Sequence, residues 1–234
     1  SVKDQYKEKA KVLLRDIEQA EEKAFKKNTI QLSTVVELSV LVEGMEAEKM
    51  KSDGKGSLIF FDNKSKKMIS MRLEDRSRQV VELETGQPLV DVGVSEEATL
   101  GLQSDQVQTI NWKSGELKKV IEADEFWKQP SLIQIFAGNA YIFDREQSEI
   151  WKYPTLGDNF GSRRRWLAAG ITPDLTKVVD MEVAGDIWLL TSSGKLEKYS
   201  RGAPVEFSME GFPTQGEAKR LNDPVAMVMA SDYV

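Results

Sequence analysis

A short two-stranded outline recurs along the chain and constrains its fold more than any other feature. The clearest copy is Asn139–Tyr153, NAYIFDREQSEIWKY, in which a polar turn starting at Asp144 joins two predicted strands. Residues that close the first strand recur at intervals of 41, 41 and 47, and matching residues of the second strand at intervals of 41, 41 and 46. The two series are Phe61, Leu102, Phe143 and Leu190, and Met71, Trp112, Tyr153 and Tyr199. Self-similarity of about 40–50 residues with hairpins inside each unit predicts β-propeller blades.

The copies predict four complete blades and the start of a fifth. They span about 47–85, 89–123, 131–169 and 177–209, and Val225–Met229 matches the first strand of a further copy. Some strands are apolar on both faces, as expected for sheets that are covered on both sides. A sandwich or barrel also contains many short strands, but neither explains the fixed period. The predicted fold is therefore mainly β, with an incomplete propeller over residues 29–234.

The first 28 residues predict a helix that precedes the propeller. Apolar residues recur there at spacings of four and three, namely Val2, Tyr6, Ala10, Leu13, Ile17, Ala20 and Ala24. The narrow stripe favours a linker helix, with self-association or partner docking through residues 1–28 as the alternative. Thr29–Glu43 is rich in β-branched residues and predicts a strand, either closing the last blade or belonging to a preceding one. Lys51–Gly56 predicts a turn rather than a phosphate-binding loop.

The residue types that are missing exclude several kinds of chemistry. The chain has no cysteine and no histidine, which excludes disulfides, thiolate chemistry, Cys/His zinc sites and Ser-His-Asp or Cys-His nucleophiles. A net charge of −6 argues against nucleic-acid binding. No apolar run approaches the length of a membrane span, and the charged N-terminus lacks a signal-peptide pattern. Because the chain starts at Ser1, we expect a piece of a longer protein, and its compartment stays open.

Two segments resemble known repeat families. YIFDREQSEIWKY at 141–153 and GDIWLLTSSGKLEKY at 185–199 are similar to the blade hairpins of NHL, YWTD and related bacterial propellers. Copies one and three keep the aspartate of that pattern, as Asp62 and Asp144, whereas copies two and four have Gln103 and Thr191. A charged helix before such a propeller also resembles bacterial proteins in which it follows a PPM-type phosphatase domain. That resemblance implies a regulatory or ligand-sensing region rather than catalysis.

The candidate interaction residues are a basic run and one tryptophan. Arg163, Arg164, Arg165 and Trp166 form a charged run that could bind an acidic or phosphorylated partner, or could form an outer strand whose charges face solvent, which we favour. The five tryptophans, Trp112, Trp127, Trp151, Trp166 and Trp188, are predicted to pack between blades, with an indole N–H that reaches a partner. Trp127 falls between two blades and is predicted to be exposed at a rim.

Acidic residues give a second set of candidates, with a structural alternative. Asp62, Asp105, Asp144 and Asp186 lie at or near hairpin turns, where a carboxylate can accept backbone N–H bonds. There is no Asp-x-Asp-x-Asp calcium loop. Asn139, Asp180 and Glu182 are the candidates for a metal site near the propeller axis. We predict no catalytic, metal or cofactor site.

Two functions of different class follow. The first is a non-catalytic propeller within a larger regulatory protein, which binds a protein, a peptide or another ligand on its rim. The second is a lactonase-type hydrolase that uses a metal bound by carboxylates, against which the lack of histidine argues. Thermal stability that depends on divalent cations would favour the hydrolase.

Overall fold

The computed structural model describes residues 2–24, 37–207 and 224–228, with side chains from Tyr6 to Ile17 in the first range. The chain forms two compact units, residues 1–37 with 207–219, and residues 38–206 with 220–234. In the first unit, helix α1 (Val2–Ala24) covers the same residues as the predicted apolar stripe. Its described side chains are exposed, including those of Tyr6, Leu13 and Ile17. No helix in the described ranges is long and apolar enough to cross a membrane.

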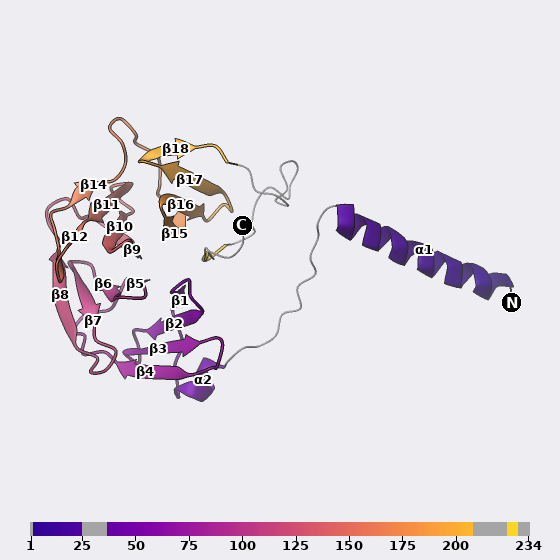
Figure 1. Cartoon of the computed structure of the whole chain (residues 1–234), viewed down its shortest axis with the longest axis horizontal. Helices are drawn as coiled ribbons and strands as arrows, with labels where there is room; N and C mark the ends of the chain where they lie inside the picture. The colour runs from indigo at the N-terminus through magenta and orange to yellow at the C-terminus, as the bar shows by residue number, and fades with distance from the viewer. Residues whose placement is uncertain (1, 25–36, 208–223, 229–234) are drawn as a thin grey trace. The chain divides into compact units, whose positions relative to one another are not determined.

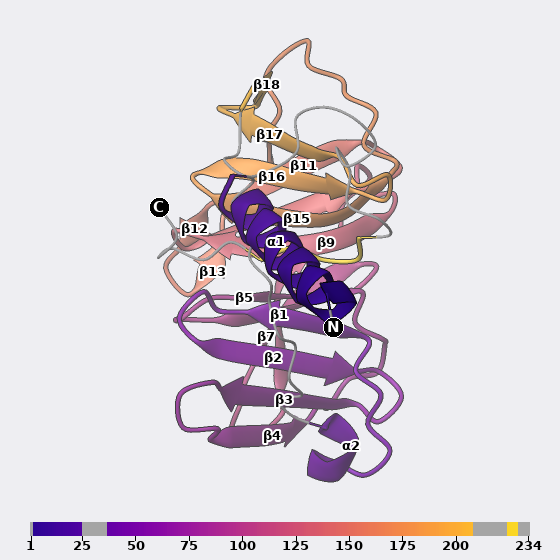
Figure 2. The same ribbon diagram turned by 90° about the vertical axis from the view of Figure 1, so that its right-hand side faces the viewer.

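The second unit contains four antiparallel four-stranded sheets, which confirm the predicted blades. In Figure 1 the sheets surround a common centre, with the first strand of each nearest to it. Figure 2 shows blade 1 from inner β1 to outer β4. Blade 1 comprises β1 (Lys49–Ser52), β2 (Ser57–Asp62), β3 (Lys67–Arg72) and β4 (Arg78–Glu82), and blade 2 comprises β5 (Asp91–Val94), β6 (Thr99–Leu102), β7 (Gln106–Ile110) and β8 (Leu117–Glu122). Blade 3 comprises β9 (Pro130–Phe136), β10 (Asn139–Asp144), β11 (Glu149–Tyr153) and β14 (Arg164–Arg165), and blade 4 comprises β15 (Val178–Ala184), β16 (Asp186–Thr191), β17 (Leu196–Ser200) and β18 (Ala203–Val205).

Consecutive blades are joined by hydrophobic cores. Phe61 and Val92 belong to one core between blades 1 and 2, Leu102 and Ile142 to another between blades 2 and 3, and further apolar residues of blades 3 and 4 to a third. The inner strands β1, β5, β9 and β15 also contact one another in that order. Covering both faces of the middle blades explains their continuous apolar strands. A short hairpin, β12 (Thr155–Leu156) with β13 (Asn159–Phe160), adds to blade 3 and contacts β8.

A repeated polar contact fixes the hairpins of blades 1, 2 and 3 to the segments that enter these blades. The Asp62 carboxylate accepts the backbone N–H of Glu46, and the Asp144 carboxylate accepts that of Lys128, in each case 16 residues earlier. In blade 2 the Gln103 side chain donates to the backbone carbonyl of residue 87, again 16 residues earlier. The aspartates of copies one and three therefore have the structural role expected of a turn carboxylate.

Three local predictions differ from the structure. Residues 38–41, inside the predicted strand Thr29–Glu43, form the short helix α2 (Leu38–Leu41), because burial of Val42 and Met45 and a positive φ at Gly44 favour a helical turn. Residues 29–36 lie outside the described residues. Strand β1 includes Lys51 and Ser52, which were predicted as a turn. Residues 224–228 form no strand, because the part of the chain that the structure describes provides no strand to pair with them.

Candidate functional site

Charged residues occupy the inner strands at equivalent positions. Four inner-strand residues pair with the residue that closes the next strand of their blade, which is the first strand of the predicted hairpin. They therefore occupy equivalent positions in the repeat, and they are Lys49, Asp91, Leu132 and Asp180. Three of these four positions are charged, and Asp91 and Asp180 are buried. Charged side chains are seldom buried unless they are paired, so the inner strands must supply partners.

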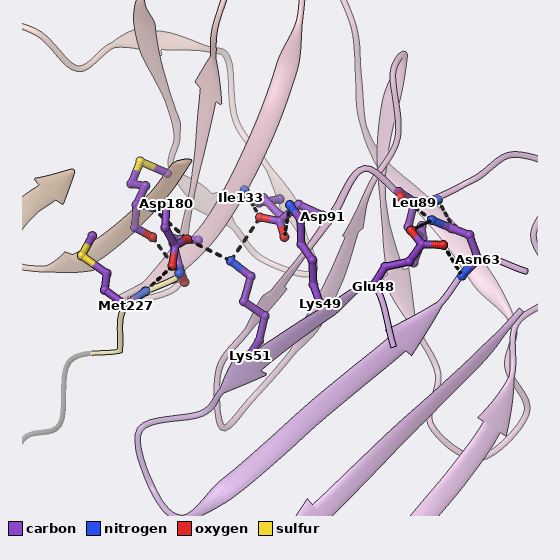
Figure 3. A network of polar contacts seen from close by, with 11 residues as sticks. Glu48, Lys49, Lys51, Asn63, Leu89, Asp91, Ile133, Asp180 and Met227 are labelled. Atoms are coloured by element: carbon purple, nitrogen blue, oxygen red, sulfur yellow. Dashed lines mark hydrogen bonds and ion pairs between the residues drawn. The ribbon is translucent and has the colours of Figure 1, made fainter. Parts of the chain in front are cut away.

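Lys51 supplies the central partner, as Figure 3 shows. Its ammonium Nζ lies 3.3 Å from Asp91 Oδ2 in blade 2 and 3.5 Å from Asp180 Oδ1 in blade 4. Lys49 Nζ donates to Asp91 Oδ1 at 3.2 Å. Lys51 is only 8% exposed and Asp91 is fully buried. One lysine of blade 1 therefore bridges two carboxylates from blades that are not consecutive, and we name these four residues the axial network.

The two aspartates of the axial network hold backbone N–H groups in the same way. Asp91 Oδ2 accepts the N–H of Ile133 in β9 at 2.9 Å. Asp180 Oδ2 accepts the N–H of Met227 at 2.8 Å. Ile133 belongs to the inner strand that follows Asp91 around the centre, so Met227 occupies the corresponding place after Asp180. Residues 224–228 thus lie where the inner strand of another blade would start, which agrees with the register predicted for Val225–Met229.

Burial and charge together set the protonation of the network. Burial by itself would lower the pKa of the Lys51 ammonium, but the nearby carboxylates of Asp91, Asp180 and Glu182 raise that pKa above its usual value. Burial, followed by the charge of Asp180, raises the pKa of Glu182 to about 7. Lys49 and Lys51 then balance the two aspartates, while Glu182 titrates near neutral pH.

A groove of about 290 Å³ lies beside the axial network. We name it the axial groove, and its walls come from β1, β9 and β15 and from the C-terminal segment; they are formed by Glu48, Lys49, Met50, Lys51, Leu132, Val179, Asp180, Val225 and Ala226. Its lining is mixed, with apolar Met50, Leu132 and Val179 beside the charges. Val225 is 84% exposed, so the C-terminal segment forms only a thin wall of the groove.

A second polar contact joins the rim of the axial groove to the next blade. The Asn63 amide donates to Glu48 Oε2 at 2.8 Å and to the carbonyl of Leu89 at 2.9 Å, and its oxygen accepts the Leu89 N–H at 2.7 Å. Figure 3 shows these residues beside the axial network. They hold Glu48 and the start of blade 2 in fixed positions.

The predicted metal candidates do not come together. Asp180 and Glu182 lie on the inner strand β15, but Asn139 lies at the start of β10, where its amide donates to the carbonyls of Phe136 and Ala137. Within the described ranges no three acidic side chains are grouped as metal ligands. The Lys51 ammonium stands between the aspartates, where a bound cation would otherwise balance them.

The structure corrects the prediction for Trp127. The side chain is only 7% exposed, because the backbone N–H of Trp127 donates to the Asp124 carbonyl and closes a turn that directs the ring inward. Its indole N–H donates to the Tyr153 hydroxyl at 2.7 Å. Packing between blades is confirmed for Trp127 and Trp151, but the buried Trp151 N–H has no partner among the described residues, contrary to expectation.

The basic run divides between two blade junctions. Arg163 lies toward blade 2, where its Nε donates to Asp124 Oδ2 at 2.8 Å. Arg165 pairs with Glu149 and donates to the carbonyls of Ala168 and Ile171, while Trp166 packs on the core between blades 3 and 4. Arg164 is exposed on β14, the outer strand of blade 3. The run is therefore partly an outer strand, as favoured, and partly a set of half-buried or exposed contacts at the blade junctions.

Sequence reasoning missed Lys51 and Asp91. Lys51 was assigned to a turn because charged residues and glycines follow it closely. The sequence signal was weak, because Lys49, Asp91 and Asp180 lie 12, 11 and 10 residues before Phe61, Leu102 and Leu190. Their equivalence becomes visible only in the pairing of the strands. A charge recurring at an inner-strand position predicts a paired, buried group.

The blades define the chain as a β-propeller protein, and solved β-propellers share the arrangement at low sequence identity. A catalytically inactive virginiamycin B lyase from Staphylococcus aureus, with quinupristin, is 12% identical at a TM-score of 0.49, over 71% of this chain and 57% of the lyase. A chain of a nidogen/laminin complex is 11% identical at a TM-score of 0.48, over 65% of this chain and 59% of that chain. YCF48 bound to D1 peptide is 14% identical at a TM-score of 0.43, over 65% of this chain and 49% of YCF48. The chain thus spans less than two thirds of the length of each, and these similarities concern the fold alone.

No protein-family model matches the sequence, and no curated protein does.

Proposed function

We propose that the chain is a non-catalytic, NHL- or YWTD-like propeller module that binds an extended segment of a protein partner in the axial groove. The observation that carries this proposal is the contact between Met227 and Asp180. There a buried carboxylate at the wall of the groove already binds the main chain of residues 224–228 through a backbone N–H.

The groove combines the contacts that an extended peptide needs. Asp180 offers an acceptor for a main-chain N–H, and Met50, Leu132 and Val179 offer apolar surface for alternate side chains. The ion pair with the Lys51 ammonium fixes the Asp180 carboxylate, so its position is established before a partner arrives. Apolar contact supplies affinity while the fixed acceptor sets the position of the partner.

A partner segment can readily replace residues 224–228 at the wall of the axial groove. Val225 and Val228 are 84% and 50% exposed, so residues 224–228 bury little apolar surface. A partner with larger apolar side chains at these positions gains burial that the segment does not have, at about 25 cal/mol per Å². We expect the partner to replace the segment at Asp180.

The alternative is a hydrolase whose metal is bound by carboxylates. In the described residues the axial carboxylates already form ion pairs with Lys51 and accept backbone N–H bonds, and Asn139 lies elsewhere. Those contacts favour binding over metal-assisted catalysis.

The test is selection of peptides from a random displayed library on the full chain, followed by affinity measurements on two variants. Met50 and Val80 are apolar strand residues of blade 1 with similar exposure, 46% and 42%, but only Met50 lines the groove. We expect Met50→Asp to weaken binding of the selected peptides about tenfold or more, which is about 1.4 kcal/mol. Val80→Asp should leave it unchanged. Equal effects of the two substitutions, or failure to select any peptide, would contradict the proposal.

A further inference from the structure

An arginine is held rigidly at the outer junction of blades 2 and 3. The Arg163 guanidinium carbon lies 4.1 Å from the ring centre of Phe126 and 4.2 Å from that of Trp151. Its Nε donates to Asp124 Oδ2, and its side chain is 18% exposed. Two aromatic rings and an ion pair therefore fix the guanidinium, so that binding a ligand would cost little further side-chain entropy.

Two sets of donors at this junction, the terminal nitrogens of Arg163 and the Tyr153 hydroxyl, have no acceptor among the described residues. Only Nε of Arg163 donates within the described part of the chain, which leaves both terminal nitrogens free. The Tyr153 hydroxyl oxygen accepts from Trp127, and its own hydrogen has no acceptor among the described residues. An arginine fork with a neighbouring hydroxyl suits a ligand that has acceptors and no donors.

These donors line a crevice of about 370 Å³, which we name the rim crevice. Its lining combines apolar Val120, Ile121 and Phe160 with polar Tyr153, Ser162 and Arg163. In Figure 1, β12 lies close to β8 at this junction, and the β12–β13 hairpin supplies Phe160. The volume falls within the range of small-molecule sites, which are about 300–1,000 Å³.

The acidic residues of the rim crevice are neutralised. Asp124 pairs with Arg163 at 2.8 Å, and Glu122 pairs with Lys119 at 2.9 Å. An incoming anion therefore meets paired carboxylates together with the free Arg163 fork. The local charge does not exclude a negative ligand.

We propose that the rim crevice binds a small oxyanion, a carboxylate or a phosphate monoester, attached to an apolar or aromatic body. The Arg163 fork receives two of its oxygens, the Tyr153 hydroxyl donates to one of them, and the body lies against Phe160. The rim crevice is distinct from the axial groove, so this inference does not depend on the function proposed above.

The test follows the tryptophan indole N–H signals of the ¹⁵N-labelled full chain by NMR. Benzoate, phenyl phosphate and neutral benzamide serve as probes. We expect at least one anion to shift the signals of Trp127 and Trp151, which border the crevice residues, without shifting that of Trp188 in blade 4. Binding of benzoate alone would identify a carboxylate ligand, binding of phenyl phosphate alone a phosphate ligand, and binding of both a shared oxyanion site.

Matched variants assign the effect to the arginine fork. Arg163→Lys keeps the charge near Asp124 but removes the fork, and we expect it to weaken anion binding about tenfold. Tyr153→Phe removes the hydroxyl, and a severalfold weakening is expected. Arg164→Gln removes an exposed neighbouring charge and should have little effect. Benzamide binding as tightly as the anions, absence of anion binding, or equal losses in Arg164→Gln and Arg163→Lys would overturn the proposal.

Discussion

The buried aspartates of the axial network form ion pairs with Lys49 and Lys51. Lys51 lies between Asp91 and Asp180. Each aspartate also accepts a backbone N–H, Asp91 from Ile133 in the next inner strand and Asp180 from Met227 in the C-terminal segment. Removing one partner of such a group leaves an uncompensated buried charge, which is far more costly than losing a surface ion pair. The residues that position the axial groove are therefore also residues that hold the blades together.

Glu182 makes stability depend on pH. Its pKa is raised from 4.5 to about 7 by burial and by Asp180, so between these values the folded chain binds more protons than the unfolded chain. The free energy of unfolding therefore falls as pH rises through this window. We expect Glu182→Gln, which stays neutral, to gain up to about 3 kcal/mol over the parent between about pH 5 and pH 8.5.

Urea unfolding at the two pH values measures this difference, and Glu74→Gln serves as an exposed control for removing one carboxylate. A stability difference for Glu182→Gln that stays constant with pH would contradict the assignment.

At the scale of the elements, a polar residue at the end of the second strand fixes each hairpin. The fully buried Asp144 accepts the N–H groups of Lys128, Gln129 and Gln147, which would otherwise lack a partner. Asp186, by contrast, lies at a turn and pairs with Lys198 at a partly exposed site. Two aspartates near hairpin turns thus have different structural importance.

We expect Asp144→Ala to lower the free energy of unfolding by about 3 kcal/mol or more, because several buried N–H groups lose their acceptor. Asp186→Ala should cause a clearly smaller loss. Chemical denaturation of both variants measures this, and equal losses would show that Asp144 acts only as a turn residue.

The hairpins were predictable because their signal is local and repeated. The hairpin predicted over Asn139–Tyr153 agrees with β10 and β11, since alternation and turn residues delimit its two strands. Strand β1 was missed because Lys49–Ser52 is charged, and its place in the sheet depends on partners in blades 2 and 4. Trp127 was placed wrongly because its burial depends on Tyr153, which lies 26 residues later.

At the scale of the whole blade unit, the candidate site depends on contacts between blades. In the described residues, cores join blades 1 to 2, 2 to 3 and 3 to 4, whereas Lys51 reaches Asp180 across the remaining interval between blades 4 and 1. Residues 224–228 lie in that interval. Hydrophobic pattern predicted the blades, but only the assembled inner strands reveal which charges meet.

The most direct test of partner binding in the axial groove is amide hydrogen exchange at Met227, with and without a selected peptide. If the peptide takes the place of residues 224–228 at Asp180, the Met227 N–H should lose protection when the peptide is bound. The Ile133 N–H, held by Asp91, should stay protected as the internal control. Unchanged exchange at Met227 in the presence of saturating peptide would contradict the account.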